Sequence, residues 1–123
     1  ELTIEVASPD GKEKRRIVGH IYDDMRPRVE EINGYRMDMI PAGAMVLILN
    51  EDRPGMIGLV GTEFGQAQVN IADMTISRRE SKAMMVLKVD QEPAEALLNR
   101  LTHRPGILKV AVIRLPAEKL SAR

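Results

Sequence analysis

The chain has 123 residues, 44% hydrophobic and 29% charged, which is the composition of one folded domain or of one small domain with part of another. Its 18 basic residues balance its 18 acidic residues, and a net charge of zero argues against a broad basic surface for nucleic acid or acidic membranes. Because the chain lacks cysteine, disulfides, thiolate nucleophiles, iron–sulfur ligation and cysteine-bound zinc are excluded.

Other residue types are too scarce for several kinds of site. The two histidines, His20 and His103, lie far apart without a metal-binding spacing, so we predict no metal site. Three aromatic residues, Tyr22, Tyr35 and Phe64, are too few for a surface on which nucleic-acid bases stack. Since the sequence contains neither a run of roughly 18 apolar residues nor a secretory leader pattern, we expect no membrane partner and a cytoplasmic location.

The first third of the chain predicts strands separated by turns. Polar and apolar residues alternate there, as in half-buried strands, and Asn33-Gly34 is a strong hairpin signal. The expected strands are 2–6, 14–22, 26–32 and 35–39, with a Pro-Asp-Gly turn at 9–12. Strands alone make a poor core at this length, so this part is expected to need a neighbour or a missing portion. Because Glu1 opens directly into a strand, we expect a piece of a longer protein, and the alternative is the removal of tag or leader residues.

From Gly43 the pattern changes to strands that alternate with helices. A helix is expected from Pro54, with Ile57, Val60 and Phe64 on its apolar face, and a second helix from 92–93. The expected strands are 44–49, 70–78, 83–89 and 107–115, and the second helix presents Ala94, Leu97, Leu98 and Leu101. With right-handed crossovers, this βαββαβ order predicts an α+β, ferredoxin-like fold, in which an antiparallel sheet carries both helices on one face.

The domain division follows the change of pattern. We expect a β-rich segment over 1–42, the βαββαβ domain over 43–116 and a polar tail over 117–123. Gly58, Gly61 and Gly65 lie inside the first expected helix rather than in the turn before it, so they do not form a dinucleotide-binding loop. We interpret them as a stripe of small residues that allows this helix to pack closely on the sheet or on a neighbour.

The segment 50–58 contains the most informative pattern, because a strand ends there and a helix begins. Free N–H groups at a helix start favour a carboxylate, and Gly55 lets a ligand approach the backbone. Asn50 and Asp52 stand beside that start, where Asp52 can accept hydrogen bonds from an ammonium group. A free amino acid presents both groups. The alternative, that Asp52 and Pro54 only cap the helix, stays open, and spacing alone favours a turn role for Asn70.

Three segments resemble an ACT domain: 50–58 (NEDRPGMIG), 69–74 (VNIADM) and 83–90 (AMMVLKVD). Residues 43–116 look most like the carboxy-terminal ACT domain of the D-3-phosphoglycerate dehydrogenase family. Residues 18–41 are similar to the end of the intervening, or allosteric substrate-binding, domain in the long form of that enzyme. The resemblance therefore implies a partial intervening domain over 1–42 and a regulatory ACT domain over 43–116.

The resemblance also implies a ligand and a partner. ACT domains pair side by side into eight-stranded sheets, and in this family L-serine, the pathway product, binds at such an interface and causes feedback inhibition. We therefore expect a homodimer whose amide groups hold the carboxylate of L-serine, with one asparagine supplied by the partner subunit. The ligand-binding residues expected from the resemblance are Asn50, Asp52, Pro54, Gly55, Met56, Ile57 and, from the partner, Asn70.

Two further implications concern individual residues. Family members differ at the position of Asn50, where a histidine or tyrosine also occurs, so a preference for serine does not follow automatically. Basic residues of the intervening domain bind a phosphate or a phosphorylated hydroxy acid in this family. Arg26, Arg28 and Arg36 are the local candidates for anion binding, and the alternative is that they are exposed strand charges.

The nucleotide-binding and substrate domains of a dehydrogenase are not in this sequence. We therefore expect no catalytic residue, no cofactor and no metal in this chain, while the parent enzyme would be an oxidoreductase that uses NAD. Allosteric control would then reach remote catalytic domains from this region.

Three alternatives share the same fold. The region is also similar to the ACT-containing part of iron–sulfur L-serine dehydratases, and it is compatible with a dimerisation module that binds no ligand, since the 83–89 strand suits a buried edge. A nucleic-acid or metal carrier is disfavoured. The central strands carry Met84, Val86, Ala111 and Ile113 where an RNA-binding sheet needs aromatic residues, and no Cys-x-x-Cys is present.

Overall fold

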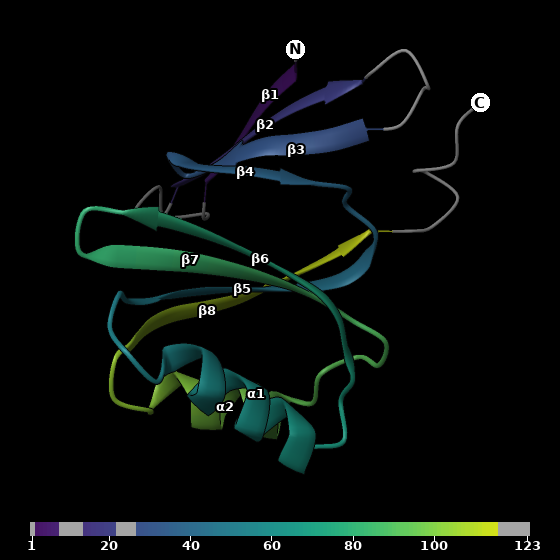
Figure 1. Ribbon diagram of the computed structural model, residues 1–123. Helices are drawn as coiled ribbons and strands as arrows, with labels where there is room; N and C mark the ends of the chain where they lie inside the picture. Colours follow the sequence, from purple (N-terminus) through teal and green to yellow (C-terminus); the bar gives the residue numbers. More distant parts are fainter. Residues whose placement is uncertain (1, 8–13, 22–26, 116–123) are drawn as a thin grey trace.

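The computed structural model describes residues 2–7, 14–21 and 27–115, which form two four-stranded antiparallel sheets and two helices. The elements are β1 (Leu2–Ala7), β2 (Lys14–Ile21), β3 (Pro27–Ile32), β4 (Tyr35–Met39), β5 (Gly43–Glu51), α1 (Met56–Gln66), β6 (Ile71–Arg79), β7 (Lys82–Val89), α2 (Glu95–Thr102) and β8 (Ile107–Leu115) (Figure 1). The expected 9–12 turn, Arg26 and the 117–123 tail lie outside the described residues.

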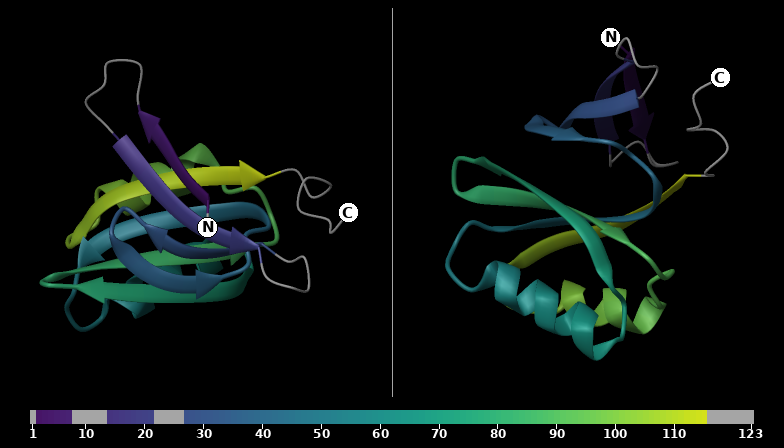
Figure 2. Two further views of the ribbon diagram at one scale, coloured as in Figure 1. Left: turned by 90° about the horizontal axis from the view of Figure 1, so that it is seen from above. Right: turned by 45° about the vertical axis from the view of Figure 1, so that its right-hand side comes forward.

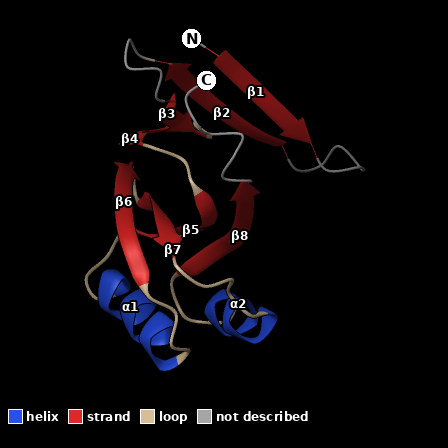
Figure 3. Cartoon of the chain, turned by 90° about the vertical axis from the view of Figure 1, so that its right-hand side faces the viewer, coloured by secondary structure: helices blue, strands red, loops and turns tan. Residues whose placement is uncertain are grey.

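The second sheet, formed by β5 to β8, has the topology that the βαββαβ order predicts. Its strand order is β6-β7-β5-β8, and every neighbouring pair is antiparallel. Both helices cover the same face of this sheet (Figures 1 and 3). The core on that face includes Val46, Ile48, Met85 and Leu87 from the two central strands. The ferredoxin-like α+β fold is therefore confirmed.

The first sheet, formed by β1 to β4, is an antiparallel meander in strand order β1-β2-β3-β4. Asn33 and Gly34 join β3 to β4 with positive φ angles of 50° and 85°, as a two-residue hairpin turn requires. The Asn33 side chain also ties the turn to the neighbouring strand β2, because its Oδ1 accepts the Arg16 N–H at 2.7 Å. The predicted hairpin at Asn33-Gly34 is therefore confirmed.

The first sheet packs on the face of the second sheet that the helices leave open (Figures 1 and 2). The core between the sheets contains Val29, Ile32, Tyr35, Met39, Met45, Leu47, Met84 and Val86. The second sheet is therefore the neighbour that the first strands were expected to need. It also explains why β5 and β7 are apolar on both faces, since each face meets a different layer.

The strand at 83–89 is not an edge. β7 lies between β5 and β6, so the expectation of a buried edge there is wrong. Its double-sided apolar pattern reflects the two layers that cover it rather than pairing with another chain. The edge strands of the second sheet are β6 and β8.

The apolar face of α1 differs from the expected one. The helix begins at Met56, two residues after Pro54, and its buried residues are Met56, Val60, Glu63 and Phe64. Ile57 is 55% exposed, so its placement on the buried face is wrong. The helix is rotated against the sheet so that the buried stripe runs from Met56 in steps of four, three and one residues.

The small-residue stripe of α1 also differs from its interpretation. Gly58, Gly61 and Gly65 are exposed, and a Cβ added to any of them would meet no atom within 4 Å. The glycines therefore do not allow close packing on the sheet, and that part of the interpretation is wrong for the described residues. Close packing on a neighbour stays a prediction.

The second helix is shorter than expected and is joined to the first by a buried carboxylate. Helix α2 begins at Glu95 rather than at 92–93, because Ala94 has an extended conformation (φ −72°, ψ 151°). Glu63 of α1 accepts a hydrogen bond from Arg100 at 3.1 Å and lies 3.6 Å from the Nε of Arg104.

Neither helix of the described residues is long and apolar enough to cross a bilayer.

Candidate functional site

The candidate site lies where β5 ends and α1 begins. Two backbone hydrogen bonds fix this loop: the Glu51 N–H donates to the Gly106 carbonyl at 2.8 Å, and the Asp52 N–H donates to the Ser81 carbonyl at 2.9 Å. Gly55, with a φ of 89°, turns the chain into the helix as its N-cap residue. No side chain of the described residues caps α1, so the alternative in which Asp52 and Pro54 cap the helix is wrong.

Asn50 is a buried polar residue with an unused acceptor. It is 1% exposed, and its Nδ2 donates to the Glu51 carbonyl at 2.8 Å. Its Oδ1 has no hydrogen-bond partner within the described part of the chain. Along β5, Asn50 follows Val46 and Ile48 at intervals of two, so it belongs to the helix-facing side of the sheet. An unsatisfied buried oxygen is costly, and a donor from outside the chain would relieve that cost.

Asp52 is held by an arginine that no sequence pattern indicated. The Nε of Arg78, on β6, donates to Oδ2 of Asp52 at 2.7 Å. The register places Arg78 opposite Ala83, and Ala83 opposite Asn50, so these three residues form one row across the end of the sheet. The site therefore combines an anion at Asp52, a cation at Arg78 and the buried oxygen of Asn50 near the uncapped start of α1.

No sequence signal marked Arg78 in advance. It lies 26 residues from Asp52, and their contact depends on the pairing of β6 with β7. The arginine appears in an alternating strand next to a second arginine, which by itself is typical of an exposed, solvated face. Only the position of β6 beside the 50–58 loop, which is a feature of the tertiary structure, brings Arg78 into contact with Asp52.

Asn70 does not join these residues within one chain. Both β5 and β6 run antiparallel to β7, so they are parallel to each other. Asp52 follows the end of β5, whereas Asn70 precedes the start of β6, and the two residues therefore lie at opposite ends of the sheet. Asn70 instead donates from Nδ2 to Asp90 Oδ2 at 2.7 Å, and its N–H donates to Gln91 Oε1 at 2.9 Å.

Of the three arginines predicted to bind an anion, Arg28 and Arg36 belong to the first sheet, and Arg26 lies outside the described residues. Arg28 donates to Asp38 Oδ1 at 2.5 Å, and this hydrogen bond lowers the pKa of the mostly exposed Asp38 carboxyl. Arg36 is exposed on β4 opposite Glu31. Arg28 is therefore already paired with a carboxylate of this chain. The anion-binding role of the three arginines stays a prediction.

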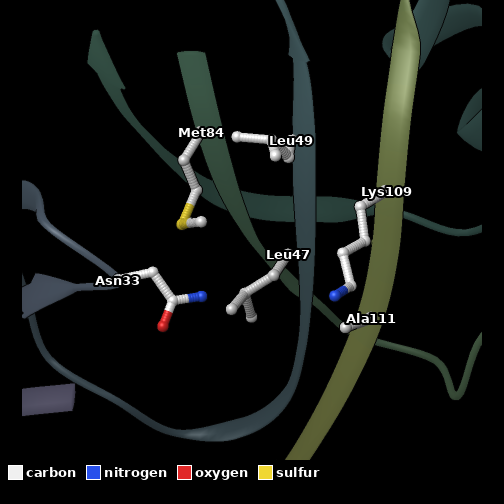
Figure 4. A pocket seen from close by; sticks show the side chains of 6 residues that line it. All are labelled: Asn33, Leu47, Leu49, Met84, Lys109 and Ala111. Carbon is white, nitrogen blue, oxygen red and sulfur yellow. The ribbon is translucent and has the colours of Figure 1, made fainter. Parts of the chain in front are cut away.

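Two pockets lie near the second sheet. An open pocket of about 350 Å³ at the candidate-site end is lined by Glu51, Asp52, Arg53, Ser81, Lys82 and Leu108. A smaller one, of about 40 Å³, lies between the sheets and is lined mostly by apolar side chains, with Asn33 and Lys109 at its sides (Figure 4). Of the predicted ligand residues, Asp52 alone lines either pocket. Within the described residues, no three His, Asp or Glu side chains are grouped as metal ligands.

Comparison with known protein families matches residues 44–103 to the ACT domain. The chain contains an ACT domain. It is also similar to D-3-phosphoglycerate dehydrogenases: 35% identical over 91% of this chain to that of Methanocaldococcus jannaschii, and 38% identical over 72% of this chain to that of Bacillus subtilis. The chain spans 22% and 17% of the length of these two relatives. The predicted resemblance to the ACT-containing regulatory part of this enzyme family is confirmed.

A relative with another name has a similar region. The chain is 23% identical over 90% of its length to a protein of Bacillus subtilis named as a probable L-serine dehydratase, beta chain, and it covers 51% of that protein. A similar region therefore occurs in proteins with two different names, the dehydrogenases and the probable dehydratase. The identity to the dehydrogenases is higher.

Proposed function

We propose that this chain is the amino-acid-binding regulatory region of a D-3-phosphoglycerate dehydrogenase and that it binds L-serine at a dimer interface for feedback inhibition. The observation that carries the proposal is the buried, unpartnered Oδ1 of Asn50 beside Asp52 at the uncapped start of α1. In the parent enzyme, residues 1–42 would be part of the intervening domain and residues 43–116 the ACT domain. The catalytic domains, their NAD and a cytoplasmic location belong to the same proposal.

The chemistry of the site matches an amino acid. The free N–H groups of Met56 and Ile57 in the first turn of α1 suit a carboxylate, and Pro54 and Gly55 leave that turn open. The ammonium group would donate to Asp52 and to the Oδ1 of Asn50, which satisfies the one buried acceptor without a partner in the described residues. The ligand would therefore supply the hydrogen bonds that the unliganded chain lacks.

The partner subunit would complete this site along β6. Strand β6 is an edge of the second sheet, with β7 on one side and no strand on the other among the described residues. If two copies pair through antiparallel β6 strands, the start of one β6 lies beside the end of the other. Asn70 of the partner subunit then approaches Arg78 and Asp52, which explains how residues at opposite ends of one sheet can contact one ligand. Pairing through β8 would leave Asn70 far from the seam.

Thermal unfolding tests the ligand directly. A ligand that binds the folded state at about a hundred times its Kd adds about 2.7 kcal/mol to the unfolding free energy, so millimolar L-serine should raise the Tm. Asp52→Ala should abolish this shift. Asp38→Ala is a matched control, because Asp38 also accepts a hydrogen bond from an arginine but lies in the first sheet. A folded dimer whose Tm responds to neither L-serine nor glycine would contradict the proposal.

A second candidate is the regulatory region of an iron–sulfur L-serine dehydratase, which the similarity to the dehydratase beta chain favours. The ligand and the site would be the same, so binding experiments do not separate the two enzymes. The remainder of the gene does: a G-x-G-x-x-G loop between a strand and a helix favours the dehydrogenase, and a cysteine-bearing region favours the dehydratase. A ligand-free dimerisation module would instead give a stable dimer without a serine response.

A further inference from the structure

The ion pair between Asp52 and Arg78 determines what a ligand meets at this site. The side chain of Asp52 is 24% exposed, whereas that of Arg78 is 74% exposed. Arg78 Nε is 2.7 Å from the same carboxylate that the proposed ligand would need for its ammonium group. Without ligand, therefore, the negative charge of the site is already neutralised by the chain itself.

A simple amine would bind poorly to such a site. It must displace the guanidinium of Arg78 from Asp52, and it has no carboxylate with which the displaced guanidinium can pair. A zwitterion is different, since its carboxylate lies one carbon away from its ammonium group. Asp52 and Arg78 present opposite charges in direct contact, which is the pattern that a zwitterion complements. Because Arg78 is mostly exposed, its side chain can turn from Asp52 toward a ligand with little loss of packing.

We propose that Arg78 is a ligand-binding residue that exchanges its bond to Asp52 for a bond to the ligand carboxylate, and so selects α-amino acids over simple amines. This inference rests on the proposed function and adds a residue to its site. The ammonium group takes the place of the guanidinium on Asp52, while the carboxylate accepts hydrogen bonds from Arg78 and from the start of α1. No proton is transferred and no bond is made in this exchange.

A small residue separates Arg78 from Asn50 in the row across the sheet end. Ala83 stands between Arg78 on β6 and Asn50 on β5, and its side chain is a single methyl group. A larger residue at that position would separate the arginine from the buried acceptor. Arginine also suits the task better than lysine, because its planar guanidinium can donate two parallel hydrogen bonds to a carboxylate.

Calorimetric titration of the 123-residue chain with two probes tests the exchange. L-serine has both charged groups, and ethanolamine is the same molecule without the carboxylate. Arg78→Ala should weaken the binding of L-serine roughly tenfold to a hundredfold, the range expected for a lost charge-assisted hydrogen bond. It should leave ethanolamine binding unchanged or tighter, because Asp52 loses its competitor. Arg78→Lys should restore part of the serine affinity.

Arg114→Ala is the matched control. Arg114 is also an exposed, edge-strand arginine bonded to a carboxylate, that of Glu92, but it lies on β8 at the other end of the sheet. This variant should bind L-serine as the unmodified chain does, and sedimentation should show the same oligomeric state for all variants.

The outcomes separate the two claims. If the unmodified chain does not bind L-serine, the proposed function fails and the inference falls with it. If the unmodified chain binds L-serine and Arg78→Ala binds it equally well or more tightly, the inference alone is overturned, and Arg78 is then merely a competitor for Asp52. Equal weakening of both probes would also overturn it, because the carboxylate would not be what Arg78 recognises.

Discussion

Asp52 and Asn70 lie at opposite ends of the second sheet, because β5 and β6 run in the same direction and the two residues follow and precede those strands, respectively. A single chain therefore cannot place both residues on one ligand. The proposed site exists only where two copies meet along β6, and this arrangement makes a specific prediction about mixed dimers.

Mixed dimers of Asp52→Ala and Asn70→Ala chains should regain one functional site. Each homodimer carries a damaged residue in both of its sites, so neither should bind L-serine. In the mixed dimer, one site combines two altered residues, and the other combines the intact Asp52 of one chain with the intact Asn70 of its partner. Titration of the mixed dimer, purified after co-refolding, should give about half the sites of the unmodified dimer. A site built within one chain would give none.

The interface between the sheets should contribute strongly to stability. Met84 is 4% exposed between the two sheets, so Met84→Ala would leave a cavity there. The expected loss in the free energy of unfolding is about 2–4 kcal/mol, measured by urea denaturation. Leu108→Ala is the control, since Leu108 is 46% exposed, and it should change stability by less than about 0.5 kcal/mol. Equal effects of both variants would contradict the sandwich of sheets.

Two glycines should respond to alanine in opposite directions. Gly34 has a φ of 85°, which strains any residue with a Cβ, so Gly34→Ala should destabilise the chain by about 1–2 kcal/mol even if the flexible Arg79 side chain moves aside. Gly61 lies exposed within α1, where a Cβ meets no neighbour. Gly61→Ala should therefore stabilise the chain by about 0.5–1 kcal/mol through helix propensity. Thermal unfolding of the two variants measures both signs.

The ion pair between Arg28 and Asp38 in the first sheet should be visible in an acid titration of the Asp38 carboxyl. The hydrogen bond from Arg28 lowers the pKa of Asp38 in the folded state. The pair therefore adds stability above the ordinary aspartate pKa of about 3.9, and that contribution is lost as the pH falls through the lowered folded value. Arg28→Gln should raise the pKa of Asp38 toward its ordinary range in an NMR titration. An unchanged pKa would show that Arg28 does not hold this carboxylate in solution.

Much of the architecture was predictable because it depends on local patterns. Alternation, helical spacing and the positions of proline and glycine indicated the strands, the helices and the Asn33-Gly34 turn, and their order led to the ferredoxin-like sheet. The same patterns did not locate the start of α1 correctly. Met56 and Ile57 are both apolar and adjacent, and which one is buried depends on how the helix is rotated against the sheet.

The candidate site was only partly predictable, because some of its residues are neighbours in the sequence and others meet only in the folded chain. The 50–58 segment is local, so its asparagine, aspartate and glycine were found from sequence. The sequence by itself determined which elements form and that a polar loop precedes a helix, because these depend on neighbouring residues. Tertiary structure alone decided that Arg78 meets Asp52 across 26 positions, that Asn50 keeps an unused oxygen, and that Asn70 lies at the far end. Strand register and direction set those distances, and local sequence does not encode them.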